Sequence, residues 1–146
     1  MSEPLDARRE SALRWLDYAR RDLKGARASL TDGELLGLAA FHAQQAAEKA
    51  LKAYAAYMGA DEIPKTHELG RLVRLVRRVG GDPVPSEGLG ELTNYAVDGR
   101  YPDEPIPDQD TAARALATAV RVYEFVRERV GQAKNAPFPG RMAAPP

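Results

Sequence analysis

The sequence contains no cysteine, and only two of its 146 residues are histidines. Without cysteine the chain can form neither disulfides nor thiolate metal sites, and it offers no thiol nucleophile. Acidic and basic residues number 21 each, so the formal net charge is zero. A balanced charge gives no bulk attraction to nucleic acid or to a membrane surface, although local patches can still bind either one. Composition therefore excludes thiol chemistry and leaves most other functions open.

Long apolar runs are missing as well. No run approaches the roughly 20 residues that a membrane span requires. The opening stretch MSEPLDARRES carries acidic residues and lacks the apolar core of a secretory signal. We therefore expect a soluble, cytoplasmic protein without membrane contact, and its length corresponds to about one domain.

Alanine-rich helical periodicity is what the sequence does contain. The stretch FHAQQAAEKALKAYAAYM, residues 41–58, places apolar residues at the i, i+3, i+4, i+7 positions of one helix face. This pattern predicts a central helix from near Glu34 to Met58, capped by Gly59. Its small alanine side chains allow neighbouring helices to approach closely.

Similar periodicity predicts four more helices, at residues 6–30, from a Thr66 cap to Gly80, from a Ser86 cap to about Val97, and from an Asp108 cap to Val130. The three-residue turn Thr31–Gly33 predicts that the first two helices are antiparallel. No alternating strand pattern, glycine-rich phosphate loop or internal repeat is present. We therefore predict an all-α, up-and-down bundle of four to five helices over residues 6–131, followed by a flexible Pro- and Ala-rich tail at 132–146.

Polar residues also recur on the predicted central helix. His42, Gln45 and Lys49 share one face, which could line a groove or a dimer interface, or could form hydrogen bonds between helices. Glu48 and Lys52 stand four residues apart, in the order that stabilises a helix. We favour the interpretation that this face is solvated or bonded to another helix.

The second histidine, His67, follows the predicted cap of the third helix, and we interpret it as structural. The two histidines do not have a metal-ligand spacing, so we predict no metal site. Two basic stripes could hold phosphates, namely Arg20, Lys24 and Arg27, and Arg71, Arg74 and Arg78. No aromatic residues are interleaved with them for base stacking, so ordinary solvated faces are favoured.

Arg100-Tyr101-Pro102 lies in a proline-rich segment that cannot form regular structure. In one interpretation Tyr95 and Tyr101 anchor the loop to the bundle, while Arg100 pairs with a carboxylate such as that of Glu48. In the other, Arg100 projects into a shared groove and binds phosphate.

Four segments together resemble the HEPN domain in its small stand-alone prokaryotic form: WLDYARRDL, FHAQQAAEKALKAY, KTHEL and NYAVDGRYPD. Their order and spacing cover roughly residues 11 to 130. The resemblance implies a helical bundle like that of nucleotidyltransferase substrate-binding subunits, which often forms a homodimer. It also implies a partner, a minimal nucleotidyltransferase encoded beside it in cassettes of toxin–antitoxin type.

Many HEPN proteins are metal-independent ribonucleases in which an arginine is followed four to six residues later by a histidine. Arg100 has no such histidine after it, and neither His42 nor His67 has such an arginine before it. We therefore favour a non-catalytic protein that needs no cofactor and binds nucleotide, phosphate or RNA through Arg100, Lys49, His42 and Tyr101. The alternatives are a divergent ribonuclease toxin that uses His42 or His67, and a purely structural dimerisation module.

Overall fold

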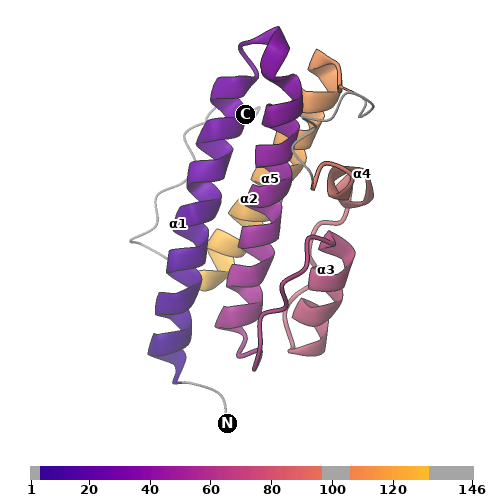
Figure 1. Ribbon diagram of the computed structural model, residues 1–146. Helices are drawn as coiled ribbons and strands as arrows, with labels where there is room; N and C mark the ends of the chain where they lie inside the picture. The colour runs from indigo at the N-terminus through magenta and orange to yellow at the C-terminus, as the bar shows by residue number, and fades with distance from the viewer. Residues whose placement is uncertain (1–3, 97–105, 132–146) are drawn as a thin grey trace.

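The computed structural model describes residues 4–96 and 106–131, and every regular element within them is helical (Figure 1). The elements are α1 (Leu5–Ser29), the short 3₁₀ helix η1 (Gly33–Leu35), α2 (Leu36–Tyr57), α3 (Leu69–Arg78), α4 (Leu89–Thr93) and α5 (Gln109–Val130). The predicted all-α bundle is thereby confirmed. The Pro- and Ala-rich tail and the Arg100–Tyr101–Pro102 segment lie outside the described residues.

Helix α2 is the centre of the bundle, with α1, α5 and α3 packed around it (Figure 1). Its predicted alanine face is fully buried, as are the alanines that face it from α1: Ala12, Ala19, Ala26, Ala39, Ala43, Ala46, Ala47 and Ala50. Because alanine has so short a side chain, the two helix backbones can pack closely along their length. Leucine and tyrosine side chains such as Leu16, Leu51 and Tyr123 fill the remaining core.

The long helices do not all alternate in direction. Gln109, at the start of α5, donates to the carbonyl of Leu30 at 3.2 Å, and Arg9 of α1 donates to the carbonyl of Gly131 after α5. Helix α5 is therefore antiparallel to α1 and runs in the same direction as α2. The chain between α2 and α5, which includes α3 and α4, returns to the other end of the bundle to allow this (Figure 1).

Local sequence signals predicted two of the helix ends correctly. After α2, Gly59 has a φ of 90°, with its amide bonded to the Ala56 carbonyl and that of Ala60 bonded to the Ala55 carbonyl, which together form a Schellman cap. The Asp108 carboxylate accepts a hydrogen bond from the Thr111 amide at 2.8 Å. Hydrogen bonds from the backbone and the side chain of Thr111 lower the pKa of Asp108. Both predicted caps are therefore confirmed.

The starts of the central, third and fourth helices differ from their predictions. Gly33–Leu35 form a 3₁₀ turn, so α2 begins at Leu36. Thr66 accepts from the Glu68 amide at 3.1 Å, so it caps the turn that leads into α3 instead of the helix itself. Gly88 has a left-handed φ of 83°, which a helix starting at Ser86 cannot accommodate, and α4 therefore begins only at Leu89 and ends at Thr93.

Candidate functional site

One carboxylate on α1 holds two of the residues that the sequence singled out on α2. His42 Nδ1 lies 3.1 Å from Asp22 Oδ1, and Lys49 Nζ lies 2.5 Å from Asp22 Oδ2. The three side chains are 14 to 29% exposed, so the cluster is partly shielded from water. The structure thus brings His42 and Lys49 together through Asp22, which sequence reasoning had missed.

The His42 ring also lies against the backbone of α1. A methyl group added at Gly25 would lie 3.3 Å from both Cδ2 and Nε2 of the ring. One ring nitrogen therefore contacts Asp22 while the other lies beside Gly25, three residues further along α1. Asp22 and Gly25 are spaced to share a helix face, but this spacing alone does not identify His42 as the residue that they contact. The hydrogen-bonding interpretation of the His42 face agrees with this geometry.

A second cluster repeats the same chemistry nearer the end of α2. Glu48 Oε2 accepts from Lys52 Nζ at 2.8 Å, and Glu48 Oε1 lies 2.8 Å from His67 Nδ1. The Glu48 and Lys52 side chains are only 5 and 8% exposed, whereas His67 is 66% exposed. The predicted Glu48–Lys52 pair is therefore confirmed, and it proves to be a buried pair that anchors the segment leading into α3.

Amides complete the hydrogen bonding around His67. The side chain of Gln44, itself fully buried, donates to the His67 carbonyl at 2.9 Å. Gln45 in turn donates to the Gln44 amide oxygen at 2.9 Å. His67 is thus bound to α2 by both its ring and its backbone, which supports its structural interpretation.

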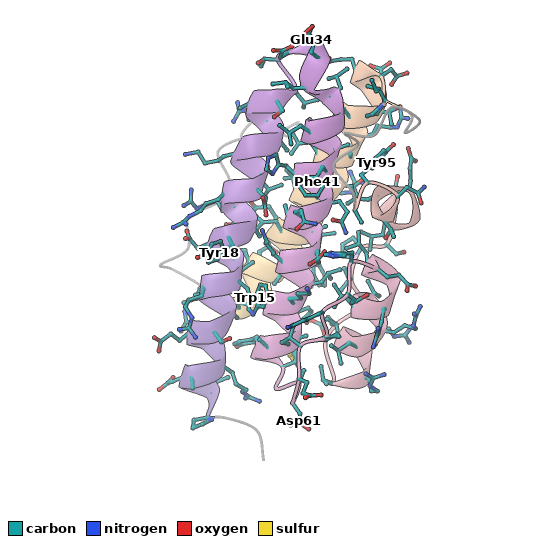
Figure 2. The ribbon with its side chains drawn as sticks, viewed as in Figure 1. Trp15, Tyr18, Glu34, Phe41, Asp61 and Tyr95 are labelled. Atoms are coloured by element: carbon teal, nitrogen blue, oxygen red, sulfur yellow. The ribbon has the colours of Figure 1, made fainter. Side chains whose placement is uncertain are left out.

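Aromatic side chains lie over these clusters on the outer surface of α1 and α2, where Figure 2 labels Trp15, Tyr18 and Phe41. We call the surface formed by these three residues the α1–α2 face. Tyr18 is 55% exposed, and the Arg21 guanidinium lies 5.1 Å from its ring centroid. Lys49 Nζ lies 6.0 Å from the same centroid. Aromatic rings beside cations are typical of binding surfaces.

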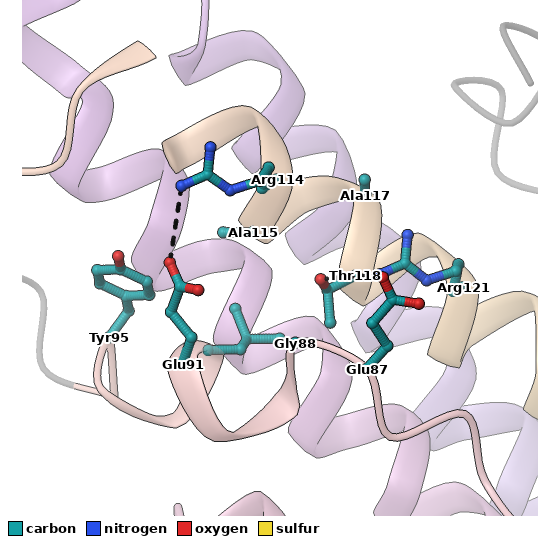
Figure 3. A pocket seen from close by; sticks show the side chains of 10 residues that line it. Glu87, Gly88, Glu91, Tyr95, Arg114, Ala115, Ala117, Thr118 and Arg121 are labelled. Carbon is teal, nitrogen blue, oxygen red and sulfur yellow. Dashed lines mark hydrogen bonds and ion pairs between the residues drawn. The ribbon is translucent and has the colours of Figure 1, made fainter. Parts of the chain in front are cut away.

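A cavity of about 340 Å³ lies between α4 and α5 (Figure 3). Glu87 and Glu91 form one side of it, and Arg114 and Arg121 form the other. Arg114 and Glu91 are 3.9 Å apart, a weak ion pair, and burial is the main cause that raises the pKa of Tyr95 at the cavity edge. The two glutamates and two arginines of the lining balance in charge, so this cavity has no net preference for an anion.

Within residues 4–96 and 106–131, no cluster of three or more His, Asp or Glu side chains is arranged to hold a metal ion. In the same ranges, no helix has the length and apolar character needed to cross a membrane. Two of the four predicted contact residues, Arg100 and Tyr101, lie outside the described part of the chain, and so does the pairing of Arg100 with Glu48 that one interpretation offered.

The fold and its polar clusters define a small helical bundle with a charged, aromatic outer face. The family model of the HEPN domain matches residues 12–129, most of the chain. The protein therefore belongs to the HEPN domain family, which confirms the resemblance noted from its sequence motifs. Comparisons with curated proteins and with solved structures gave no match.

Proposed function

We propose that this chain is a non-catalytic HEPN-domain binding protein that forms a homodimer and works with a small nucleotidyltransferase encoded beside it, in a system of toxin–antitoxin type. The bonding of the two imidazoles is the observation that supports the non-catalytic part of the proposal, and the partner and the homodimer are taken from the family resemblance. Among the described residues, the side chains bonded to His42 and His67 are the carboxylates of Asp22 and Glu48, and not arginines. Neither ring is therefore paired there with the cation that phosphoryl cleavage needs beside its proton-transfer group.

The α1–α2 face supports a role in binding. Exposed aromatic residues and arginine are enriched in the central parts of protein interfaces, and this face combines Tyr18 with Arg21. The same ring could stack a nucleotide base while Lys49 contacts its phosphate. Since Asp22 already holds Lys49 and His42, a phosphate must compete with that carboxylate, so nucleotide binding through these residues is weak.

Co-expression with the product of the neighbouring nucleotidyltransferase reading frame tests the proposal. We expect the two proteins to co-purify, and light scattering to show a dimer of the isolated chain. Tyr18→Glu should weaken self-association, because it places a charge on the aromatic face. Arg77→Glu, which changes an exposed residue on α3, is the matched control.

Incubation of the purified chain with RNA in the presence of a chelator tests whether the chain cleaves RNA without a metal ion. Persistent intact RNA agrees with a non-catalytic protein. Cleavage that disappears on substitution of either histidine would overturn the proposal, since it would show proton transfer by an imidazole.

The Glu48–His67 pair favours a second candidate, metal-independent RNA cleavage. Glu48 orients the ring through Nδ1, and the 66% exposed ring leaves Nε2 without a bonded group among the described residues. Such an arrangement can hold a ring for acid–base chemistry. In this case His67→Gln would abolish cleavage and relieve growth arrest in cells, whereas His42→Gln would leave both unchanged.

A further inference from the structure

A groove beside α3 is lined by residues that belong to neither histidine cluster. The chain after α2 passes along α3 and encloses with it a groove of about 810 Å³. Figure 2 labels Asp61 where the chain leaves α2 at this end of the bundle. The segment 60–65 forms one wall of the groove, and one side of α3 forms the other.

Arginines on one stripe of α3 give the groove a positive charge. Arg71, Arg74 and Arg78 are spaced i, i+3, i+7, so their side chains share one side of the helix. With Lys65 they contribute four positive charges, against two negative charges from Asp61 and Glu62, a net of +2.

The arginines of this stripe are poorly neutralised by the protein itself. Arg74 makes one long contact, 3.7 Å to Glu68, and both side chains are at least 60% exposed. Among the described residues, Arg71 and Arg78 form no ion pair. An exposed pair at this distance contributes little, so all three guanidiniums are free to bind carboxylate or phosphate oxygens.

Apolar side chains line the groove beneath these charges. Leu75 is 7% exposed, and Ile63 and Val79 are half-buried. No aromatic residue lines the groove, so it offers no ring on which a base could stack. Asp61 and Glu62 would also repel a continuous phosphate backbone. The mixture of cations with aliphatic side chains instead complements a segment that carries both carboxylates and apolar side chains.

We propose that this groove binds an acidic, partly apolar segment of a partner protein. Carboxylates of that segment pair with Arg71, Arg74 and Arg78, whose planar guanidiniums can each hold a carboxylate through two hydrogen bonds. Aliphatic side chains of the segment pack on Ile63 and Val79. The three arginines span about 10 Å along the helix axis, which two helical turns of a bound peptide would match. The inference rests on the proposed binding function and specifies where a partner docks.

Fluorescence anisotropy with the full chain tests this proposal. The probe is a labelled helical peptide of about 14 residues built from Glu and Leu, long enough to cover the stripe. We expect saturable binding that weakens as salt increases. The triple variant Arg71→Gln, Arg74→Gln, Arg78→Gln should weaken it about tenfold or more, whereas Arg77→Gln, on the same helix but outside the groove lining, should leave it unchanged.

Two further probes separate the alternatives. A peptide with Ser in place of Leu should bind more weakly, because it loses the apolar contacts. A labelled oligouridine would overturn the proposal in favour of a nucleic-acid groove if it bound the unchanged chain more tightly than the peptide does and failed to bind the triple variant. Equal peptide binding by the triple variant and by the unchanged chain, with both folded by circular dichroism, would also overturn it.

The same measurements distinguish failure of this inference from failure of the proposed function. If the nucleotidyltransferase co-purifies but the peptide does not bind, only the groove assignment is wrong. If the peptide binds through the arginines while no nucleotidyltransferase co-purifies, the groove assignment stands and the named partner is wrong.

Discussion

His42 and Asp22 join α2 to α1 through a contact of 3.1 Å, with the imidazole held against Gly25. The contact explains why a glycine stands inside a long helix, where it costs about 1 kcal/mol relative to alanine. A side chain at this position would push on the ring. The glycine thus makes room for a polar link between the two helices.

Gly25→Ala tests this relationship in two backgrounds. In the unchanged chain the added methyl meets the His42 ring at 3.3 Å, so crowding offsets the gain in helix propensity. In a His42→Ala background the ring is absent, and the same substitution should stabilise by about 1 kcal/mol. Urea unfolding of the four proteins measures the coupling, which we expect to exceed about 0.5 kcal/mol. Equal effects in both backgrounds would show that the ring does not crowd position 25.

Asp22→Asn should destabilise the bundle and increase its affinity for anions. The carboxylate binds both Lys49 and His42 and is 14% exposed, so its loss should lower the free energy of unfolding by about 1–2 kcal/mol. Lys49 is then released to bind inorganic phosphate, which calorimetry would detect. Asp17→Asn is the control, because that carboxylate is 39% exposed and its loss should cost less than about 0.5 kcal/mol. If both variants lost similar stability, Asp22 would not contribute more to the bundle than the more exposed Asp17.

Glu48→Gln should lower the free energy of unfolding by more than Asp22→Asn does. It leaves the Lys52 ammonium, 8% exposed, without its counter-charge, and breaking a buried pair in this way costs about 3 kcal/mol or more. Removing both charges, with Glu48→Leu and Lys52→Met, should cost less than Glu48→Gln alone. Glu10→Gln, in an exposed pair with Arg14, should have almost no effect. Chemical denaturation measures all three, and a double variant less stable than Glu48→Gln would count against an uncompensated charge as the cause.

Tyr123 should make the protein sensitive to alkaline pH. Burial raises the pKa of this fully buried side chain from 10.0 to about 12. Because the folded state keeps its proton longer than the unfolded state, the stabilisation is complete below pH 10.0 and is lost as pH rises through about 12. The loss amounts to roughly 2–3 kcal/mol.

The free energy of unfolding, measured from about pH 9 to about pH 12, should therefore fall less steeply in Tyr123→Phe than in the unchanged chain. A difference in the free energy of unfolding that stays constant with pH would reflect other contacts of the hydroxyl group. Parallel curves across this range would contradict a raised pKa.

Sequence predicted those parts of the fold that depend on neighbouring residues. The alanine periodicity of α2 and its Gly59 cap follow from local backbone preferences, so both were found. The start of α4 was not predicted correctly, because Gly88 has a left-handed conformation and packs against α5. A Cβ atom at this position would lie 2.6 Å from Thr118 Oγ1. Thr118 is thirty positions away in the chain, beyond the reach of a local pattern.

The candidate site shows the same division. Lys49 and His42 were predicted to share a face because helical spacing places them there. Their common partner, Asp22, depends on how α1 is rotated about its own axis against α2, and one sequence does not fix that rotation. The Arg71, Arg74 and Arg78 stripe was found from its spacing, but the groove beside it was not, since the groove exists only where the segment after α2 folds back beside α3.

The shared direction of α2 and α5 bears on how the chain assembles during synthesis. Helices α1 and α2 are separated by a short turn and can pair as soon as both have been made, because closing a short loop costs little entropy. Two hydrogen bonds between the ends of α1 and α5 join residues 79 and 122 positions apart. The side of the nascent hairpin that α5 will cover therefore stays open until α5 itself has left the ribosome, and during that interval a chaperone or a second hairpin could occupy it.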